Sequence, residues 1–110
     1  MEFLFIIADA PDAEPWPDEP PPGDWGGEMD ARGVRVRGNR LRPAAEATTV
    51  RLRGHDLLVT DGAITEGRDW TVGYDIIECV DLDEAVQIAA LHPMARYGRV
   101  EIRPAWPFED

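Results

Sequence analysis

Lysine is absent from this chain, and cysteine and histidine are scarce. Without a lysine, the protein cannot form a Schiff base with a carbonyl compound or build a Walker-type phosphate loop. The single cysteine, Cys79, has no partner for an internal disulfide, which is typical of the reducing cytoplasm. Cys79 and the separated histidines His55 and His92 match no zinc pattern, and the glycines at 23–27 match no nucleotide fingerprint. We therefore expect no metal and no cofactor.

Long apolar runs and an excess of positive charge are also missing. No segment approaches the length that spans a bilayer, so no membrane segment is expected. The opening MEFLFIIA is too short and too poor in basic residues for a signal peptide, and we interpret it as a first β-strand. Acidic residues outnumber arginines by 22 to 11, which gives a net charge of −11. Such a chain repels nucleic-acid backbones and anionic membranes, so we expect neither as a partner.

The composition that remains is that of one folded domain. A chain of 110 residues, of which 44% are hydrophobic, can bury one core and is too short for two domains. We therefore expect a single domain over residues 1–110. Residues 9–23 interrupt it with six prolines and interspersed acids, which predicts an extended surface loop. Trp16 in this loop either pins it to the body or faces a cleft.

The clearest local signals lie in residues 70–104, which predict a strand, a helix and a strand. Asp81 is a good N-cap, and apolar residues recur after it at helical spacing. Pro93 should stop this helix near residue 91 or 92. β-Branched and aromatic residues fill 72–80, and apolar residues alternate with charged ones in 99–103, as in strands.

The rest of the chain predicts further strands around one short helix. Residues 3–8 form an apolar run typical of a strand covered on both faces. Residues 24–32 predict a helix weakened by glycines, residues 34–42 a bent strand, and residues 47–60 a hairpin. The order is that of an α+β protein with the ferredoxin-like βαββαβ frame and an inserted β-hairpin.

Helices on one side of such a sheet leave its other face uncovered. We assign Asp75, Ile77 and Cys79 to that uncovered face. Two copies that pack sheet on sheet would bury it, which predicts a homodimer built as a dimeric α+β barrel with a partly polar cavity.

A buried Asp75 would need a guanidinium or a hydrogen bond, and Arg42, Arg51 and Arg103 are the available guanidiniums. The resulting network is either structural ion pairing or a binding site for a small organic anion. Tyr74 and Trp25 are further candidate ligand-binding residues. Residues 9–30 contain acids and no bases, whereas residues 32–53 contain seven arginines. These two segments either pair with each other, or the arginines bind an acidic ligand beneath the proline-rich loop.

Several short motifs point to a known family. They include Leu41-Arg42-Pro43, Thr60-Asp61-Gly62, the helix start at 81–85 and His92-Pro93. Over residues 40–104 and the first strand, the sequence resembles the YCII-related proteins, specifically the DGPF-type branch. The resemblance implies a dimeric α+β barrel of ferredoxin-like subunits with a pocket at the dimer interface. It also implies a His–Asp catalytic pair, as proposed in the wider group, whose histidine lies on the first helix.

The chain departs from this family at two points. The Asp-Gly-Pro-Phe signature reads Asp61-Gly62-Ala63-Ile64 here, and no histidine precedes His55. Asp61 and His92 remain as catalytic candidates. Asp61 either serves as a base or closes an Asx-type turn. His92 either transfers protons or caps the helix C-terminus, where the helix dipole favours its charged form.

Three functions fit these observations. The first is a dimeric protein that binds a small organic molecule in an interface pocket, and it leads because the family signature survives while the first-helix histidine does not. The second is a cofactor-independent lyase or isomerase that uses Asp61 or His92. The third is a structural or regulatory protein whose cavity is filled by side chains.

Overall fold

The computed structural model describes residues 1–63 and 71–108. Its elements are β1 (Glu2–Ala8), α1 (Trp25–Ala31), β2 (Arg35–Arg40), the 3₁₀ turn η1 (Ala44–Glu46), β3 (Thr48–Arg53), β4 (Asp56–Asp61), β5 (Thr71–Glu78), α2 (Leu82–Ala90), α3 (Met94–Tyr97) and β6 (Arg99–Pro104). The turn η1 and the short helix α3 were not expected. Ile64 of the altered signature and Trp70, the expected start of the strand–helix–strand unit, lie outside the described residues.

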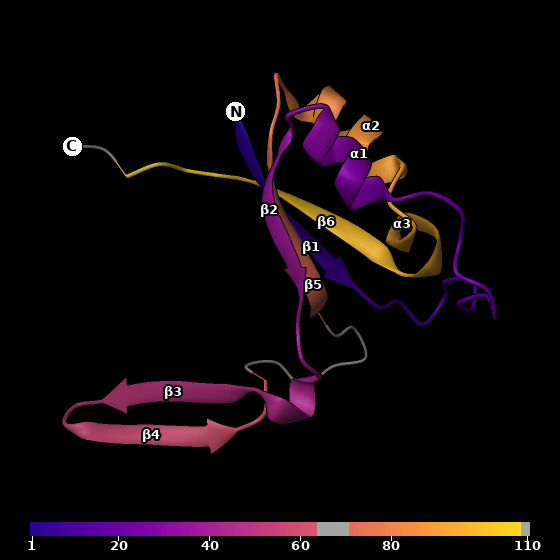
Figure 1. Ribbon diagram of the computed structural model, residues 1–110. Coiled ribbons are helices and arrows are strands. Elements are labelled where there is room, and N and C mark those ends of the chain that lie inside the picture. The colour runs from indigo at the N-terminus through magenta and orange to yellow at the C-terminus, as the bar shows by residue number, and fades with distance from the viewer. Residues whose placement is uncertain (64–70, 109–110) are drawn as a thin grey trace.

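Four strands form an antiparallel sheet in the order β2-β5-β1-β6, with the three helices on one side of it (Figure 1). Strands β3 and β4, which follow each other between β2 and β5 in the chain, form a separate two-stranded sheet. The predicted α+β class is confirmed, and the antiparallel arrangement is compatible with a ferredoxin-like fold. Among the described residues, no helix is both long enough and apolar enough to cross a membrane.

Both longer helices begin where the sequence predicts. The side chain of Asp24 accepts a hydrogen bond from the backbone N–H of Gly27 at 3.1 Å, and Asp81 accepts one from Glu84 at 2.9 Å. These bonds satisfy backbone donors that would otherwise lack a partner in the first helical turn. Helix α2 ends at Ala90, and Pro93 then starts the short helix α3.

The hydrophobic core lies between the helices and one face of the sheet. Phe3, Phe5 and Ile7 alternate along β1 toward the helices, where they meet Trp25 and Ile88. The residues between them on β1 face the other way, and Leu4 is partly exposed. The helices cover one face of β1, and the cover expected on its other face, a second copy of the chain, stays a prediction.

The pairing of β1 with β5 corrects a prediction. Ile77 pairs with Phe3, and Asp75 pairs with Phe5, so these β5 residues face the helices together with Cys79. The sequence analysis assigned them to the uncovered face. Alternation identified correctly which residues share a face, but it could not tell which face the helices would cover.

The proline-rich loop returns to the body through Trp16. The indole of Trp16 packs edge-on against Tyr97, with 5.1 Å between the ring centroids. Trp16 also lines a hollow beside α1. Both interpretations of this tryptophan, a pin and a residue facing a cleft, are therefore supported.

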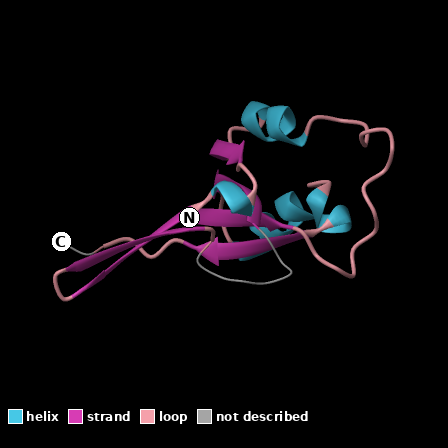
Figure 2. Cartoon of the chain, turned by 90° about the horizontal axis from the view of Figure 1, so that it is seen from below, coloured by secondary structure: helices cyan, strands magenta, loops and turns pink. Residues whose placement is uncertain are grey.

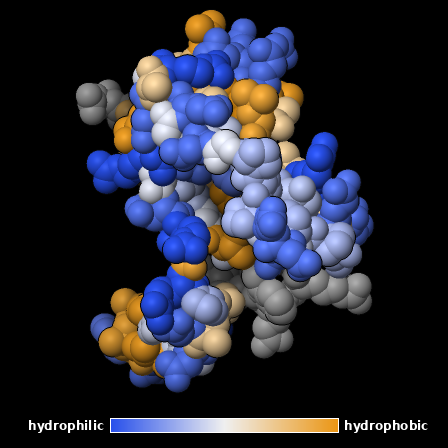
Figure 3. All heavy atoms as spheres, turned by 45° about the vertical axis from the view of Figure 1, so that its right-hand side comes forward, coloured by the Kyte–Doolittle hydropathy of each residue, from blue (hydrophilic) through white to orange (hydrophobic). Residues whose placement is uncertain are grey.

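Strands β3 and β4 form an arm (residues 48–61) that projects from the body (Figures 1 and 2). One face of the arm is formed by two apolar cross-strand pairs, Val50 with Val59 and Leu52 with Leu57. All four side chains are 59–64% exposed. Figure 3 shows hydrophobic residues gathered on the outer surface of the arm. The arm is thus an amphipathic ribbon, and no other described part of the chain covers its apolar face.

Candidate functional site

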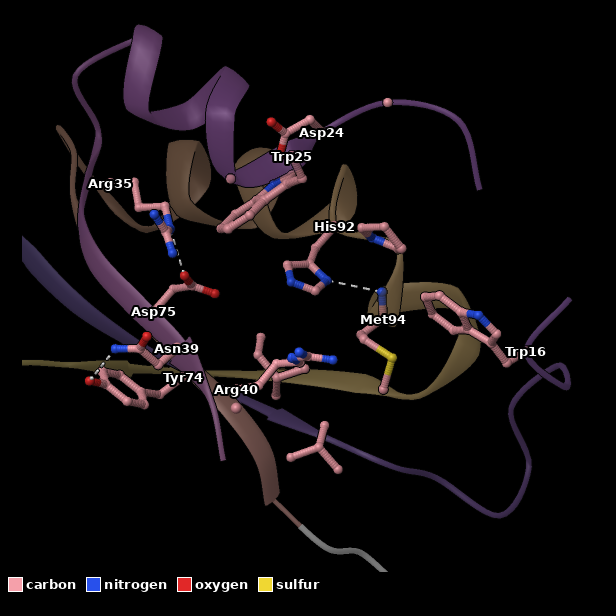
Figure 4. Close-up of a pocket in the computed structure, with 16 residues that line it drawn as sticks. Trp16, Asp24, Trp25, Arg35, Asn39, Arg40, Tyr74, Asp75, His92 and Met94 are labelled. Carbon is pink, nitrogen blue, oxygen red and sulfur yellow. Dashed lines mark hydrogen bonds and ion pairs between the residues drawn. The ribbon is translucent and has the colours of Figure 1, made fainter. Parts of the chain in front are cut away.

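A hollow of about 440 Å³ opens on the helix-covered side of the sheet, between α1, the α2–α3 junction and strands β2 and β5 (Figure 4). Ile7, Trp16, Trp25, Val72 and Met94 supply much of its apolar lining. Its polar side chains include Asp75, Arg35, Arg40 and His92. The hollow lies within one chain, on the face opposite to the one where the sequence analysis placed the cavity.

Two glycines on the sheet bear on the hollow, because Gly73 lines it and Gly38 makes room for the Asp75 carboxylate. Gly38 on β2 lies directly opposite Asp75, and a Cβ atom at Gly38 would collide with the Asp75 carboxylate. Gly73 lies between Ile7 on β1 and Arg40 on β2, so no side chain fills the sheet surface there. Gly38 is needed because the Asp75 carboxylate occupies the place of a side chain, and at Gly73 a Cβ atom would lie 3.0 Å from the backbone oxygen of Asn39.

Asp75 is a buried carboxylate held by one arginine. Its side chain is 8% exposed, and its Oδ1 accepts a hydrogen bond of 2.8 Å from Nε of Arg35. Arg35 also pairs with both carboxylate oxygens of Asp30 at 3.2 Å and donates to the Gly38 carbonyl at 3.1 Å. Burial raises the pKa of Asp75, and the Arg35 guanidinium opposes part of that rise. Among the residues described by the structure, Oδ2 of Asp75 has no hydrogen-bond donor.

His92 lies opposite this carboxylate at the end of α2. Its Nδ1 accepts a hydrogen bond of 3.0 Å from the backbone N–H of Met94, so the proton of the neutral ring is on Nε2. The Trp25 ring packs against the imidazole with 4.6 Å between centroids. Burial lowers the pKa of His92, although the charge of Asp75 acts in the opposite direction. Burial thus acts on the pKa of His92 in the opposite direction to the effect expected of the helix dipole.

The two groups are arranged for acid–base chemistry. Figure 4 shows Asp75 and His92 facing each other across the hollow, with Arg35 on the far side of the carboxylate. Asp75 offers an open carboxylate oxygen with a raised pKa, and His92 offers a neutral N–H donor. Such a pair can take a proton from a bound molecule and stabilise the negative charge that develops on it.

A model of the YCII-related domain matches residues 1–109. The chain belongs to the YCII-related family. A curated relative, the uncharacterized protein R00369 of Rhizobium meliloti (strain 1021), is 34% identical over 67 residues. That match covers 59% of this chain and 54% of the relative, so the chain spans about half the length of that protein. Assignment to the DGPF branch remains a prediction.

This YCII-related chain brings four of the predicted site residues together. Asp75, Trp25, Tyr74 and His92 all line the hollow. Asp75 was expected to need an arginine, and it has one, but its partner is Arg35. Within the chain, Asp75 does not pair with Arg42, Arg51 or Arg103, and a network of these arginines inside a dimer stays a prediction.

The other predicted residues of the YCII-related chain lie elsewhere. Asp61 and Arg51 border a separate hollow on the arm, and Arg42 pairs with Glu46 in an exposed ion pair. Arg103 lies on the uncovered face of the sheet, where it pairs with Glu101 at 3.4 Å. In the single chain these residues are therefore not part of the site that contains His92.

Arg35 and Arg40 are the residues that sequence reasoning missed. The β2–β5 register shifts between Arg35 and Arg37, so simple alternation from Val34 places the arginines on the wrong faces. Gly38 was the available signal, because a glycine inside a charged strand indicates close approach of another group.

The proposed pairing of the acidic and arginine-rich segments is seen at Arg35 with Asp30. Among the described residues, no three potential metal ligands cluster.

Proposed function

We propose that this protein is a cofactor-independent isomerase or lyase that moves a proton on a small carbonyl compound bound in the hollow. One observation carries the proposal. Asp75 is buried with one oxygen fixed by Arg35, while its other oxygen faces a cavity that His92 borders from the opposite side. Groups with shifted pKa values that converge on a cavity are typical of active sites.

In the proposed reaction, Asp75 takes the proton from a carbon next to the carbonyl group. The electrons of the broken C–H bond form an enolate, whose oxygen accepts a hydrogen bond from Nε2–H of His92. When a C=C bond lies next to the α-carbon, the enolate is a dienolate, and Asp75 returns the proton to its γ-carbon, which shifts the double bond and completes an isomerisation. The raised pKa makes Asp75 a stronger base, and the lowered pKa keeps His92 neutral near pH 7.

Proton exchange with deuterated water tests this chemistry. Acetophenone and benzoylpropanoate are incubated with the protein in D₂O, and loss of the α-proton signal is followed by NMR. Asp75→Asn should abolish the catalysed exchange, and His92→Gln should lower it about a hundred-fold, the typical effect of losing an oxyanion donor. Asp83→Asn, on the exposed side of α2, is the control. Exchange that continues unchanged in folded Asp75→Asn contradicts the proposal.

Binding without chemistry is the second candidate. The apolar walls that Trp16 and Trp25 provide support it, because binding pockets are mostly apolar with a few placed polar groups. In that case a ligand would raise the melting temperature of the wild type and of Asp75→Asn alike, without proton exchange. An open hollow beside a buried carboxylate favours both candidates over a structural protein with a filled cavity.

We also propose that the protein is a homodimer. The uncovered sheet face carries Leu4, Ile6 and Ile76, and the arm carries the exposed apolar pairs described above. An isolated two-stranded sheet is marginally stable in water, and exposed apolar patches of this kind mark interaction surfaces. A dimeric α+β barrel would cover both. Light scattering should give the mass of two chains.

A reducing cytoplasm is the compartment we propose, and the free thiol of Cys79 supports it.

A further inference from the structure

Arg40 lines the same hollow and has a charge that is not yet matched. Within residues 1–63 and 71–108, its guanidinium has neither an ion-pair nor a hydrogen-bond partner. Arg35 differs in this respect, because Asp75, Asp30 and the Gly38 carbonyl occupy its donors. A guanidinium beside an apolar cavity without an anion of its own can bind one from a ligand.

The strand register places Arg40 at a defined offset from the proposed base. Asp75 lies opposite Gly38, and Arg40 lies two residues farther along β2 on the same face, opposite Gly73. Diagonal neighbours of this kind are roughly 7–8 Å apart across a sheet. Gly73, which lines the hollow beside both residues, places no side chain between them. In Figure 4, Arg40 extends into the hollow below His92.

We propose that Arg40 binds a carboxylate group of the substrate, so that the substrates are small keto acids rather than neutral ketones. The inference rests on the proposed function, since that function places the carbonyl group between Asp75 and His92. A carboxylate a few carbons away from the carbonyl then reaches Arg40 past Gly73. The planar guanidinium binds both carboxylate oxygens and orients the α-carbon toward Asp75.

Binding measurements test the inference with benzoylpropanoate and its neutral methyl ester as probes. Quenching of tryptophan fluorescence reports binding, because Trp16 and Trp25 line the hollow. The wild type should bind the acid at least ten-fold more tightly than the ester, as expected for a charge-assisted hydrogen bond. Arg40→Met should remove that preference by weakening acid binding and leaving ester binding unchanged.

Two further variants sharpen the test. Arg37→Met removes an exposed arginine from the same strand, on the side of Ile76 and away from the hollow, and should keep the preference for the acid. Arg40→Lys keeps the charge without the bidentate geometry and should retain part of the preference. Equal loss in Arg37→Met and Arg40→Met would overturn the inference, since it would show a general charge effect.

The outcomes also separate this inference from the proposed function. If proton exchange is as fast with acetophenone as with benzoylpropanoate, and Arg40→Met changes neither, Arg40 has no role and the inference fails while the catalytic proposal stands. If the acid binds through Arg40 but undergoes no exchange, carboxylate recognition stands and catalysis fails. Failure of both acid and ester to bind would overturn the inference.

Discussion

The same residue types are buried in the body of the protein and exposed in its arm. Phe5 is fully buried beneath the helices, whereas Leu52 on the arm is 62% exposed. In the body, Arg35 forms a largely buried ion pair with Asp75, whereas Arg42 at the base of the arm pairs with Glu46 in water. His92 is packed against Trp25, and His55 lies exposed in the turn of the arm. The core of the body is therefore closed within one chain, whereas the described residues leave the apolar face of the arm exposed.

The largest effect expected from this contrast is on core packing. Phe5→Ala should lower the free energy of unfolding by about 3–5 kcal/mol, because it leaves a cavity between the sheet and the helices. Leu52→Ala in the arm should change the stability of the dilute chain by less than about 0.5 kcal/mol. Urea unfolding followed by circular dichroism measures both. Equal losses would show that the arm packs on its own body.

Ion pairing gives the second contrast. Arg35→Met should cost about 3 kcal/mol, because it strands the Asp75 carboxylate in a site that is largely closed to water. The matched variant Arg42→Met should have almost no effect, since exposed pairs contribute little. Adding Asp75→Leu to Arg35→Met should recover most of the loss in the same urea experiment. If the double variant is no more stable than Arg35→Met, the cost does not come from the stranded charge.

The third contrast is a pH dependence. Burial lowers the pKa of His92 below 6.5, so the unfolded chain takes up a proton first as the pH falls. The stability that neutral His92 contributes is therefore present above pH 6.5 and lost as the pH falls through its lowered folded value. Asp75 acts oppositely. Because the pKa of Asp75 is raised in the folded protein, the stability that its protonated form contributes is present below pH 3.8. This stability is lost as the pH rises through the folded pKa.

Unfolding curves taken from about pH 5 to 7.5 should separate these effects. His92→Gln should flatten the decline in stability below pH 6.5. His55→Gln, in the exposed turn of the arm, should leave the wild-type profile in place. A wild-type profile retained in His92→Gln would mean that this imidazole is not the group that titrates.

The contrast also explains what the sequence could predict. The cap at Asp81 depends on neighbouring residues, and it was predicted correctly because the signal is local. The alternation within the arm is likewise a local signal, and it matches the pairing of β3 with β4. The direction in which Asp75 faces depends on which side of the sheet the helices cover, and strand alternation is silent on that choice.

The site was harder to predict than the fold. His92 and Asp75 were both named, but nothing in the pattern showed that they share a hollow, since one follows a helix and the other lies within a strand. Arg35 was missed because the register shift in β2 reverses the apparent faces of its arginines. Gly38 and Gly73 look like weak strand positions until their neighbours across the sheet are known. Long-range register, rather than local propensity, assembles the site.

One substitution in the arm, Leu52→Asp, should change the stability of the single chain least and the formation of the dimer most. Leu52→Asp places a carboxylate on the apolar face of the arm, where the side chain is already exposed, so the dilute chain should unfold at nearly the wild-type urea concentration. In a dimer that buries this face, the same carboxylate would be desolvated without a partner. Light scattering should then show a shift from two chains to one. Arg53→Asp, on the opposite face of the arm, changes the charge more and should leave the dimer intact. If the wild type has the mass of one chain at every concentration, or if both variants dissociate alike, the apolar face of the arm does not bind a second copy.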